Sequence, residues 1–444
     1  MNLVYGIKDK PKFPQLLVFA FQQVLAILAA TIAVPAIIGN GMSQAAALFG
    51  AGIGTLVYQL FTKFKSPVYL GSSFAFLGSM GAAFAGATSA AAGFAGLLLG
   101  AVFAGLVYVV IAIAVKFAGV NWINKLMPPV VIGPTVAIIG MSLAGNAVGD
   151  LTTGRVTGCS PYIALVCGLV TLFSVIFFSV YGKKMMKLIP FILGILCGYV
   201  AATIFTVIGI STNNAALQVI DFSVFKNMTI FAVPDFTFVK AFNGLKEVTV
   251  PYIIAIAFAY VPVAFVVFAE HIADHKNLSS IIGQDLLEEP GLHRTLLGDG
   301  FGSIAGAFFG GCPNTTYGES VGCVAITRNA SVITITAAAV LCIIISFFGP
   351  FVTFLASIPN CVMGGVCMTL YGFIAVSGLK MIQKVDLNAS KNLFVVAAIL
   401  IAGIGGLSLS IPLGGGNVIT LTSIACALIL GILVNLFVSK ANED

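Results

Sequence analysis

Hydrophobic residues in this 444-residue chain form long runs separated by short polar loops. Most of these runs approach the length of about 20 residues that a helix needs to cross a hydrocarbon core. We therefore predict an all-α polytopic membrane protein with fourteen transmembrane segments. Their expected ranges are 16–39, 44–62, 66–86, 91–115, 129–148, 161–181, 187–211, 250–273, 293–311, 313–327, 330–347, 350–378, 392–407 and 416–439.

Basic residues are divided unequally between the two sides of this predicted topology. Seventeen of the 21 Lys and Arg residues fall on the side of the termini, and only Arg155, Lys226, Lys240 and Lys246 fall on the other. Because cytoplasmic loops are enriched in Lys and Arg, this bias places both termini in the cytoplasm. One miscounted segment would scramble the alternation, so the bias also supports the number fourteen.

Two sequence patterns recur seven segments apart. A proline followed by two glycines begins at Pro128 in the fifth segment and again at Pro359 in the twelfth. A proline, β-prone residues, a glycine and a helix start occupy residues 66–74 in the third segment and 313–320 in the tenth. Because seven is odd, the second repeat must be inverted in the membrane. We therefore expect two inverted seven-segment repeats, with short extended stretches in segments 3 and 10.

Composition excludes several classes of protein. Hydrophobic residues make up 59% of the chain and charged residues only 8%, whereas about a quarter of a soluble domain is charged. The net charge of +6 is spread over many short loops, so we expect no nucleic-acid partner. The nine cysteines lie mostly in apolar runs without metal or redox spacing, which indicates buried thiols. We expect no cofactor, no metal and no cleaved signal peptide.

The stretch Cys312–Arg328 contains the strongest candidate for a binding site. Its β-prone residues 314–317 precede Gly318, which allows a turn, and a half-length helix then begins at Glu319. If Arg328 lies at the membrane surface, Glu319 lies near the midplane of the bilayer. An interrupted helix with a carboxylate at that depth is typical of a transporter's binding site.

Two further carboxylates are expected close to this depth. Glu270 and Asp274 lie four residues apart and therefore on one helix face. Pairing with a lysine or capping of a helix end is the alternative, but neither segment contains a Lys or Arg. Like charges in a medium of low dielectric cannot all ionise, so one of Glu270, Asp274 and Glu319 should hold a proton. We predict that these three residues couple transport to protons.

Three other titratable residues, Asp299, His271 and His275, lie near these carboxylates in the sequence. Asp299 is a possible fourth carboxylate, which we expect nearer the inner surface. We expect His271 to serve in packing and His275 to lie at the interface, on a different side of the helix.

Aromatic residues complete the candidate site. Phe74 follows the glycine of the third segment and could stack on a flat ligand, with Ser73 beside it. Tyr317 precedes the other break, and Tyr371 lies in the twelfth segment. Backbone amides at both half-helix starts, near Phe74 and Gly318, could donate to ligand carbonyl groups.

Several motifs resemble one family. They are Pro313–Gly322 continuing to Thr327 and Arg328, Tyr69–Phe76, Ala269–His271, Pro290–Arg294, and Val362–Gly365 with Tyr371 and Gly372. This set is similar to the nucleobase/ascorbate transporter family, and most similar to its bacterial uracil permeases.

The resemblance implies an architecture and residue roles. A core domain would hold segments 1–4 (1–127) and 8–11 (249–347), and a gate domain segments 5–7 (128–248) and 12–14 (348–444). A homodimer would be common. Glu270 and Glu319 would bind the N–H groups of the base, Phe74 would stack on its ring, and Tyr371 would approach from the gate.

Three positions distinguish this chain within the family pattern. Ser320 stands where the family usually has Asn, and Asp274 where uracil permeases often have His. Purine-transporting relatives tend to carry Gln where Glu319 stands, and an ionised Glu suits the N–H edge of a pyrimidinedione.

The sequence therefore predicts proton-coupled uptake of uracil across the cytoplasmic (inner) membrane by alternating access. The alternatives are a xanthine or purine permease of the same family and an anion transporter of the same architecture. A channel would show continuous polar pore-lining helices, and a membrane enzyme would need a metal or nucleophile cluster. Neither feature is evident, so we expect a carrier in contact with lipid rather than an enzyme.

Overall fold

The protein is mostly helical, as the hydrophobic pattern predicts. The computed structural model describes residues 3–119, 122, 126–183, 185–226, 228–414 and 417–439. Eight helical stretches within these residues are long and apolar enough to cross a membrane. They are α1 (Phe13–Ile38), α2 (Gln44–Phe61), α4 (Ala90–Ala118), α6 (Pro129–Ser142) continued by α7 (Ala144–Leu151), α8 (Pro161–Tyr181), α10 (Pro190–Ser211), α12 (Val250–Ile282) and α17 (Asn360–Ile382). The number fourteen and the inverted repeat stay predictions.

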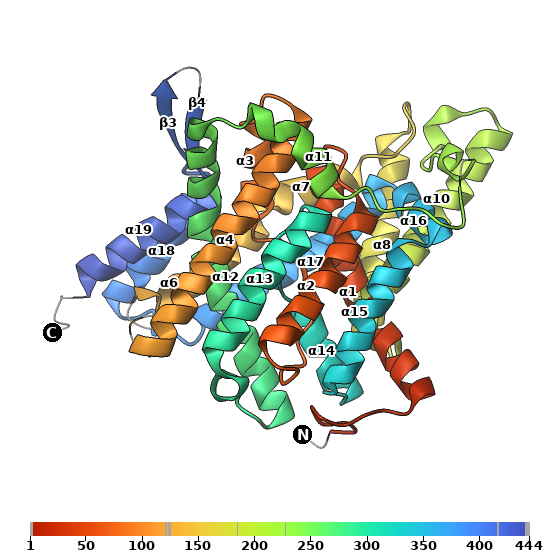
Figure 1. The fold of residues 1–444 in the computed structure, drawn as a ribbon. Helices are drawn as coiled ribbons and strands as arrows, with labels where there is room; N and C mark the ends of the chain where they lie inside the picture. The colour runs from red at the N-terminus through yellow and green to blue at the C-terminus, as the bar shows by residue number, and fades with distance from the viewer. Residues whose placement is uncertain are drawn as a thin grey trace.

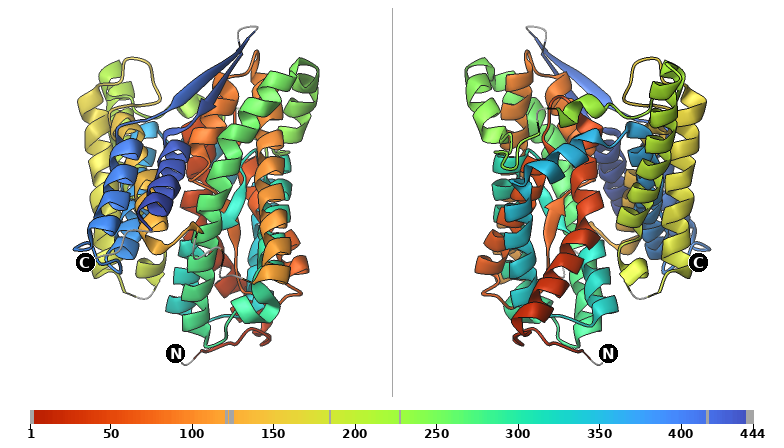
Figure 2. Two further views of the ribbon diagram at one scale, coloured as in Figure 1. Left: turned by 90° about the vertical axis from the view of Figure 1, so that its left-hand side faces the viewer. Right: turned by 90° about the vertical axis from the view of Figure 1, so that its right-hand side faces the viewer.

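The helices pack into two bundles that stand side by side (Figures 1 and 2). The first bundle consists of α1, α2, α4 and α12 with α3 (Leu77–Ala85), α13 (Leu292–Gly310), α14 (Gly318–Thr327) and α15 (Val332–Ser346). The second consists of α6, α7, α8, α10 and α17 with α9 (Met185–Leu188), α18 (Ser390–Ile404) and α19 (Ser423–Val438). The short α16 (Gly349–Ser357) contacts α2 and α15 of the first bundle.

Two short strands lie inside the first bundle (Figure 2). The strands β1 (Leu70–Ser72) and β2 (Asn314–Thr316) are antiparallel, with Leu70 opposite Thr316 and Ser72 opposite Asn314. They fall where the sequence predicts extended backbone in segments 3 and 10, so this prediction is confirmed. The pairing brings two parts of the chain more than 200 residues apart to one place. Each strand is followed by a short helix, α3 or α14.

Close helix packing holds these strands in position. Helices α2 and α13 approach through small residues, and a Cβ atom added to Gly54 would lie 2.7 Å from the carbonyl oxygen of Gly302. The Asn314 amide enters this seam and donates to the carbonyl oxygen of Gly50 over 2.9 Å. The first residue of β2 is therefore fixed to α2.

The helix α12, which carries Glu270, has well-defined ends. The Thr249 hydroxyl accepts a hydrogen bond from the Tyr252 backbone N–H and satisfies one of the free donors of the first turn. The helix ends at Gly283, whose φ of +73° is the left-handed conformation that glycine adopts readily. α12 therefore extends well past the predicted end at residue 273. A short turn, Leu287–Gly291, then leads from α12 to α13.

The last predicted segment also requires a correction. A β-hairpin of β3 (Leu409–Gly414) and β4 (Asn417–Leu421) precedes α19, which begins at Ser423 rather than near 416. The sequence predicts extended backbone only in segments 3 and 10, whereas the structure has this hairpin as well. β-branched residues on both sides of a glycine run favour a hairpin over a helix. The hairpin projects beyond the helices at the top of Figure 1, and β4 contacts α12.

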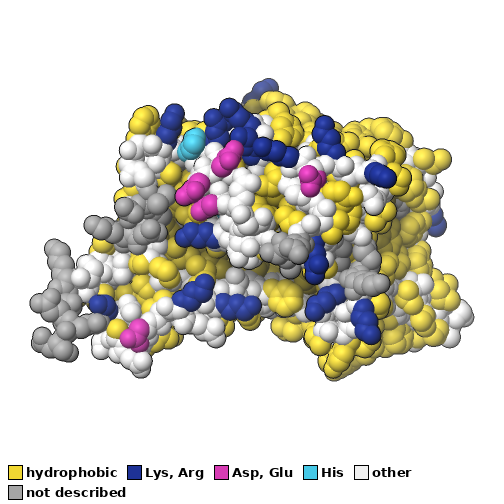
Figure 3. Space-filling view, turned by 90° about the horizontal axis from the view of Figure 1, so that it is seen from below, with side chains coloured by type: hydrophobic (Ala, Val, Ile, Leu, Met, Phe, Trp, Pro, Cys, Tyr) yellow, Lys and Arg dark blue, Asp and Glu magenta, His cyan; other side chains and the backbone are white. Residues whose placement is uncertain are grey.

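The predicted outer loop between Ser211 and Val248 contains only short helical elements: η1 (Ala215–Leu217), η2 (Phe222–Phe225), α11 (Thr237–Gly244) and η3 (Leu245–Glu247). Of these, α11 packs on α4 and α13. The chain near the N-terminus instead meets the end of α14 at the bottom of Figure 1, where the Val4 N–H donates to the Arg328 carbonyl oxygen over 2.8 Å. Seen from below, this end of the molecule carries many Lys and Arg side chains (Figure 3). The cytoplasmic position of both termini stays a prediction.

Candidate functional site

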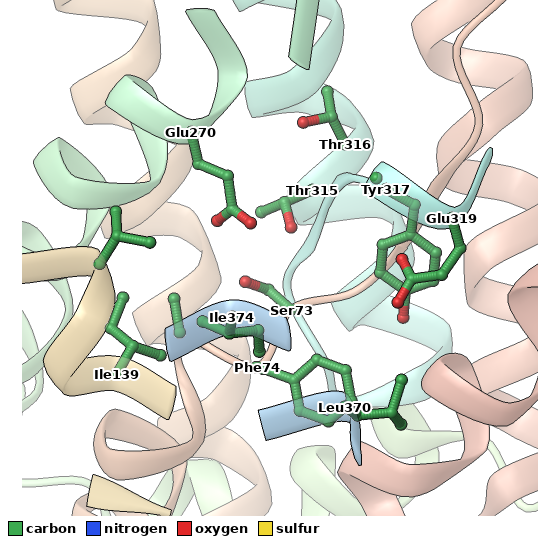
Figure 4. Close-up of a pocket in the computed structure, with 13 residues that line it drawn as sticks. Ser73, Phe74, Ile139, Glu270, Thr315, Thr316, Tyr317, Glu319, Leu370 and Ile374 are labelled. Atoms are coloured by element: carbon green, nitrogen blue, oxygen red, sulfur yellow. The ribbon is translucent and has the colours of Figure 1, made fainter. Parts of the chain in front are cut away.

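A small cavity lies between the two strand ends and the second bundle (Figure 4). Its volume is about 50 Å³, which is room for a few water molecules. Its lining comes from both bundles: Ser73, Phe74, Ala75, Glu270, Thr315, Thr316, Tyr317, Gly318 and Glu319 from the first, and Val136, Ile139, Leu370 and Ile374 from the second. All the predicted substrate-binding residues except Tyr371 therefore line one cavity.

Two carboxyl groups approach this cavity from opposite sides (Figure 4). Glu270 reaches it from α12, and Glu319 reaches it from the first turn of α14. Both arrive at the level of the strand ends because α14 begins directly after β2. Ion pairs of Lys or Arg in the described part of the chain include Lys65–Glu289 and Lys240–Asp235, whereas His271 and Asp299 form a buried hydrogen bond. Neither glutamate is in an ion pair there, so pairing with a lysine is not their role.

Asp274 lies one helical turn beyond Glu270 and does not line the cavity. Its carboxylate accepts a hydrogen bond from the Thr316 hydroxyl over 2.6 Å. Thr316 itself lines the cavity and is the last residue of β2. Asp274 is therefore connected to the cavity through one side chain of the strand, and Thr316 is a contact that the sequence did not identify.

Tyr317 forms a rigid wall rather than a free polar group. Its hydroxyl donates to the Ser72 carbonyl oxygen over 2.7 Å, and its ring packs against Gly71. The Ser73 N–H donates to the Pro313 carbonyl oxygen over 2.9 Å. These bonds connect the two breaks directly, so the start of α14 and the chain after β1 keep a fixed separation.

Phe74 and Tyr371 form an aromatic contact between the bundles. Their ring centroids are 5.8 Å apart at an interplanar angle of 79°, an edge-to-face arrangement. Tyr371 is buried and does not line the cavity, whereas its partner Phe74 does. It can therefore orient Phe74 in this state, whereas direct contact with a ligand would require movement.

Ser320, where the family pattern usually has Asn, has a specific partner. The Gln23 side-chain amide donates to the Ser320 hydroxyl over 2.5 Å, and both residues are buried. The bond joins α1 to the first turn of α14, next to Glu319. The serine at this position therefore helps to position the half-helix. No local sequence pattern indicates Gln23 as its partner.

The predictions for the two histidines are wrong in part. His271 and His275 are both fully buried, and their rings stack with centroids 4.0 Å apart. Residues four apart share a helix face, so they cannot point to different sides. His275 is not interfacial, because its Nδ1–H donates to the His271 carbonyl oxygen and its Nε2 lies 2.7 Å from the Tyr58 hydroxyl.

Asp299 is buried in the first bundle and does not lie at a surface as expected. Its Oδ2 is 2.7 Å from Nδ1 of His271, and neither side chain is exposed. The Thr295 hydroxyl lies 3.0 Å from Nε2 of the same ring. This pair joins α12 to α13 on the face of α12 next to the one that carries Glu270. The four-residue spacing of His271 and His275 indicated that they share a helix face. It could not indicate Asp299 as the partner of His271, because Asp299 lies on another helix.

Two larger cavities lie on either side of the site along α17. The outer one, of about 520 Å³, is lined by Asn360 and Met363 of α17 together with the end of α1. The inner one, of about 640 Å³, is lined by Lys380 and Met381 of α17 together with α12 and α6. The site contacts Leu370 and Ile374, between these two levels. The site therefore lies between two larger cavities along α17.

A closed site at broken helices, between two bundles of a multi-pass membrane protein, defines a membrane transporter of the carrier type. The chain belongs to the family whose model is described as "Permease family", which matches residues 14–411. The resemblance to the nucleobase transporters is thereby confirmed.

Similar proteins include the uracil permease of Bacillus caldolyticus, which is 39% identical over 98% of this chain and 94% of that protein. The uracil permease of Bacillus subtilis (strain 168) is 37% identical over 99% and 96%, and that of Escherichia coli (strain K12) is 33% identical over 96% and 93%. These relatives and the family are transporters rather than enzymes.

Among solved structures, the transmembrane domain of the cyanobacterial bicarbonate transporter BicA superposes with a TM-score of 0.62 at 15% identity. The alignment covers 97% of this chain and all of that one. SLC26A9 gives a TM-score of 0.64 at 12% identity, covering 97% and 66%. At such low identity these structures share the fold alone.

Proposed function

We propose that this protein takes up uracil together with protons across the cytoplasmic membrane. The observation that carries the proposal is the approach of Glu270 and Glu319 to one cavity from opposite sides, between two helix breaks. The relatives described as uracil permeases over nearly their whole length support the choice of substrate.

Recognition of the base would use complementary hydrogen bonds. Uracil presents two N–H donors and two carbonyl acceptors on a flat ring. Ionised carboxylates only accept, so Glu270 and Glu319 suit the N–H groups. The first N–H groups of α14, from Gly318 onward, have no partner within the helix and suit a carbonyl oxygen, as do amides near Ser73 and Phe74. The Phe74 ring would stack on the base.

Transport would proceed by alternating access. The first bundle would act as the core (1–127 and 249–347) and the second as the gate (128–248 and 348–444). The antiparallel pairing of β1 with β2 supports fourteen segments in two inverted repeats. Because the closed cavity lies between larger outer and inner cavities, a shift of one bundle against the other would open one side at a time.

Proton coupling would use the three carboxyl groups around the strand ends. Glu270, Asp274 and Glu319 are concentrated in one region, and none is in an ion pair within the described residues. A proton shared among them relieves their mutual repulsion and changes an acceptor into a donor. The Thr316 hydroxyl, which bonds Asp274, could transmit this change to β2.

The cellular setting belongs to the same proposal. The basic lower face supports a cytoplasmic position of both termini in a bacterial-type inner membrane. The family resemblance implies a homodimer surrounded by lipid, and the permease relatives support a carrier rather than an enzyme.

Reconstitution in liposomes tests the proposed function. With an inward proton gradient, labelled uracil should accumulate above its external concentration, and a protonophore should abolish the excess. Empty liposomes treated in the same way provide the control. Uptake that only equilibrates, with or without the gradient, would contradict proton coupling.

A further inference from the structure

The inner cavity has a chemical character that uracil does not explain. It lies below the closed site, between α12 of the first bundle and α6 and α17 of the second. Its charged lining residues are Lys276, Lys380 and Lys384, and no acidic side chain of the described residues lines it. A neutral base needs no such group of cations.

These lysines are available to a ligand. Within the described part of the chain, none of the three side chains takes part in an ion pair or hydrogen bond. Lys380 lies in the last turn of α17, Lys384 lies just beyond the end of this helix, and Lys276 lies on α12; all three line the cavity. Other basic residues of the lower face are spread over separate loops. The general enrichment of cytoplasmic loops in Lys and Arg accounts for that distribution. Here three of them line one cavity.

The rest of the lining is apolar. It includes Met127, Ile132, Phe268, Ile272 and Met381, with Asn277 as a further polar side chain. The cavity thus has a group of lysines and an apolar wall. A ligand with an anionic end and a flat or apolar body matches this combination. Phosphate groups are suitable anions for lysine, which binds them as a compact charge with three donors.

We infer that the inner cavity binds a phosphate-bearing anion, such as a nucleoside monophosphate, with its phosphate between Lys276, Lys380 and Lys384. The anion joins the two bundles, because one lysine belongs to the first and two belong to the second. Without it, the three positive charges repel one another across the cavity and favour separation at this level. The bound anion therefore closes the inner route and slows exchange of the transported base.

Binding is tested without uracil. Thermal unfolding of the purified protein in detergent is followed with sodium phosphate and with uridine monophosphate, at constant ionic strength set by chloride. Both should raise the melting temperature in proportion to occupancy, and the nucleotide more strongly because its base contacts the apolar lining. In the double variant Lys380→Gln/Lys384→Gln the apparent affinity should fall about tenfold or more. The matched control Lys63→Gln, an exposed lysine outside the cavity, should respond as the unmodified protein does.

The source of the phosphate group is distinguished by a lipid arm. Nanodiscs containing phosphatidylglycerol are compared with nanodiscs of phosphatidylcholine alone. Stabilisation by phosphatidylglycerol only, lost in the double variant, identifies a lipid headgroup, whereas a response to the nucleotide in detergent identifies a soluble ligand. Equal responses in the unmodified protein and the double variant, or none to any probe, would overturn the inference.

The effect on transport rests on the proposed function and is measured separately. Uridine monophosphate on the cytoplasmic side should slow uracil exchange in the unmodified protein and not in the double variant. If uridine monophosphate binds but does not slow uracil exchange, the proposed closure of the inner route is wrong and the binding site stands. If the protein does not transport uracil at all, the proposed function is wrong, and the binding test remains valid.

Discussion

Replacement of Glu319 with glutamine is expected to weaken uracil binding about 10- to 100-fold and to abolish proton-driven accumulation. A hydrogen bond to a charged group contributes about 1.5–3 kcal/mol, which corresponds to this range. Glutamine fills nearly the same space, but its amide end adds N–H donors toward the N–H edge of the base and cannot take up a proton. Binding is measured by titration of purified protein, and accumulation in liposomes with an inward proton gradient.

The control for this substitution is Glu288→Gln, at an exposed glutamate in the turn after α12. It removes the same charge far from the cavity and should leave both measurements unchanged. The corresponding change at Glu270 should resemble Glu319→Gln, since both carboxyl groups line the cavity. If Glu319→Gln retained full proton-driven accumulation, that carboxyl group would not couple transport to protons.

The second large effect concerns stability and Asp299. The substitution Asp299→Ala is expected to destabilise the folded protein by about 1–3 kcal/mol, the usual cost of leaving a buried polar group without its hydrogen-bond partner. His271 would lose the carboxylate that is 2.7 Å from its Nδ1, in a region where neither side chain reaches solvent. The melting temperature in detergent should fall strongly.

An exposed ion pair provides the comparison for Asp299. The substitution Asp235→Ala removes the partner of Lys240, and the Asp235 side chain is 59% exposed. Exposed pairs contribute about 0–1 kcal/mol, so this variant should melt close to the unmodified protein. Equal melting temperatures for the two variants would show that the buried pair does not stabilise the packing of α12 on α13.

The site was accessible to prediction because its signals are local. A proline, β-prone residues and a glycine occur together before Phe74 and before Glu319, and the structure has a strand and then a short helix at both places. The four-residue spacing of Glu270 and Asp274 fixes their common helix face without tertiary information. These patterns led to Phe74, Glu270 and Glu319, which line one cavity, and to Asp274, which is connected to it through Thr316. The roles of these residues in binding stay proposals.

Other features depend on contacts between distant segments. Nothing local to Ser320 indicates that Gln23 on α1 is its partner, and nothing local to Asp299 indicates that it meets His271. The strand β4 was predicted as the start of the last membrane segment, because hydropathy does not distinguish a β-prone run from a helical one. The interfacial position predicted for His275 is wrong, because the burial of this side chain depends on the packing of α2 and α13 against α12. Its distance from the end of the helix does not determine its exposure.

The central claim is that the cavity between Glu270 and Glu319 binds uracil. The most direct measurement is the thermal stability of the purified protein with a panel of free bases that includes uracil and xanthine. A ligand that binds only the folded state at 100 times its dissociation constant stabilises it by about 2.7 kcal/mol. Uracil should raise the melting temperature and xanthine should not, with the response weakened in Glu319→Gln. Stabilisation by xanthine alone, or by no base, would contradict the assignment of uracil to this site.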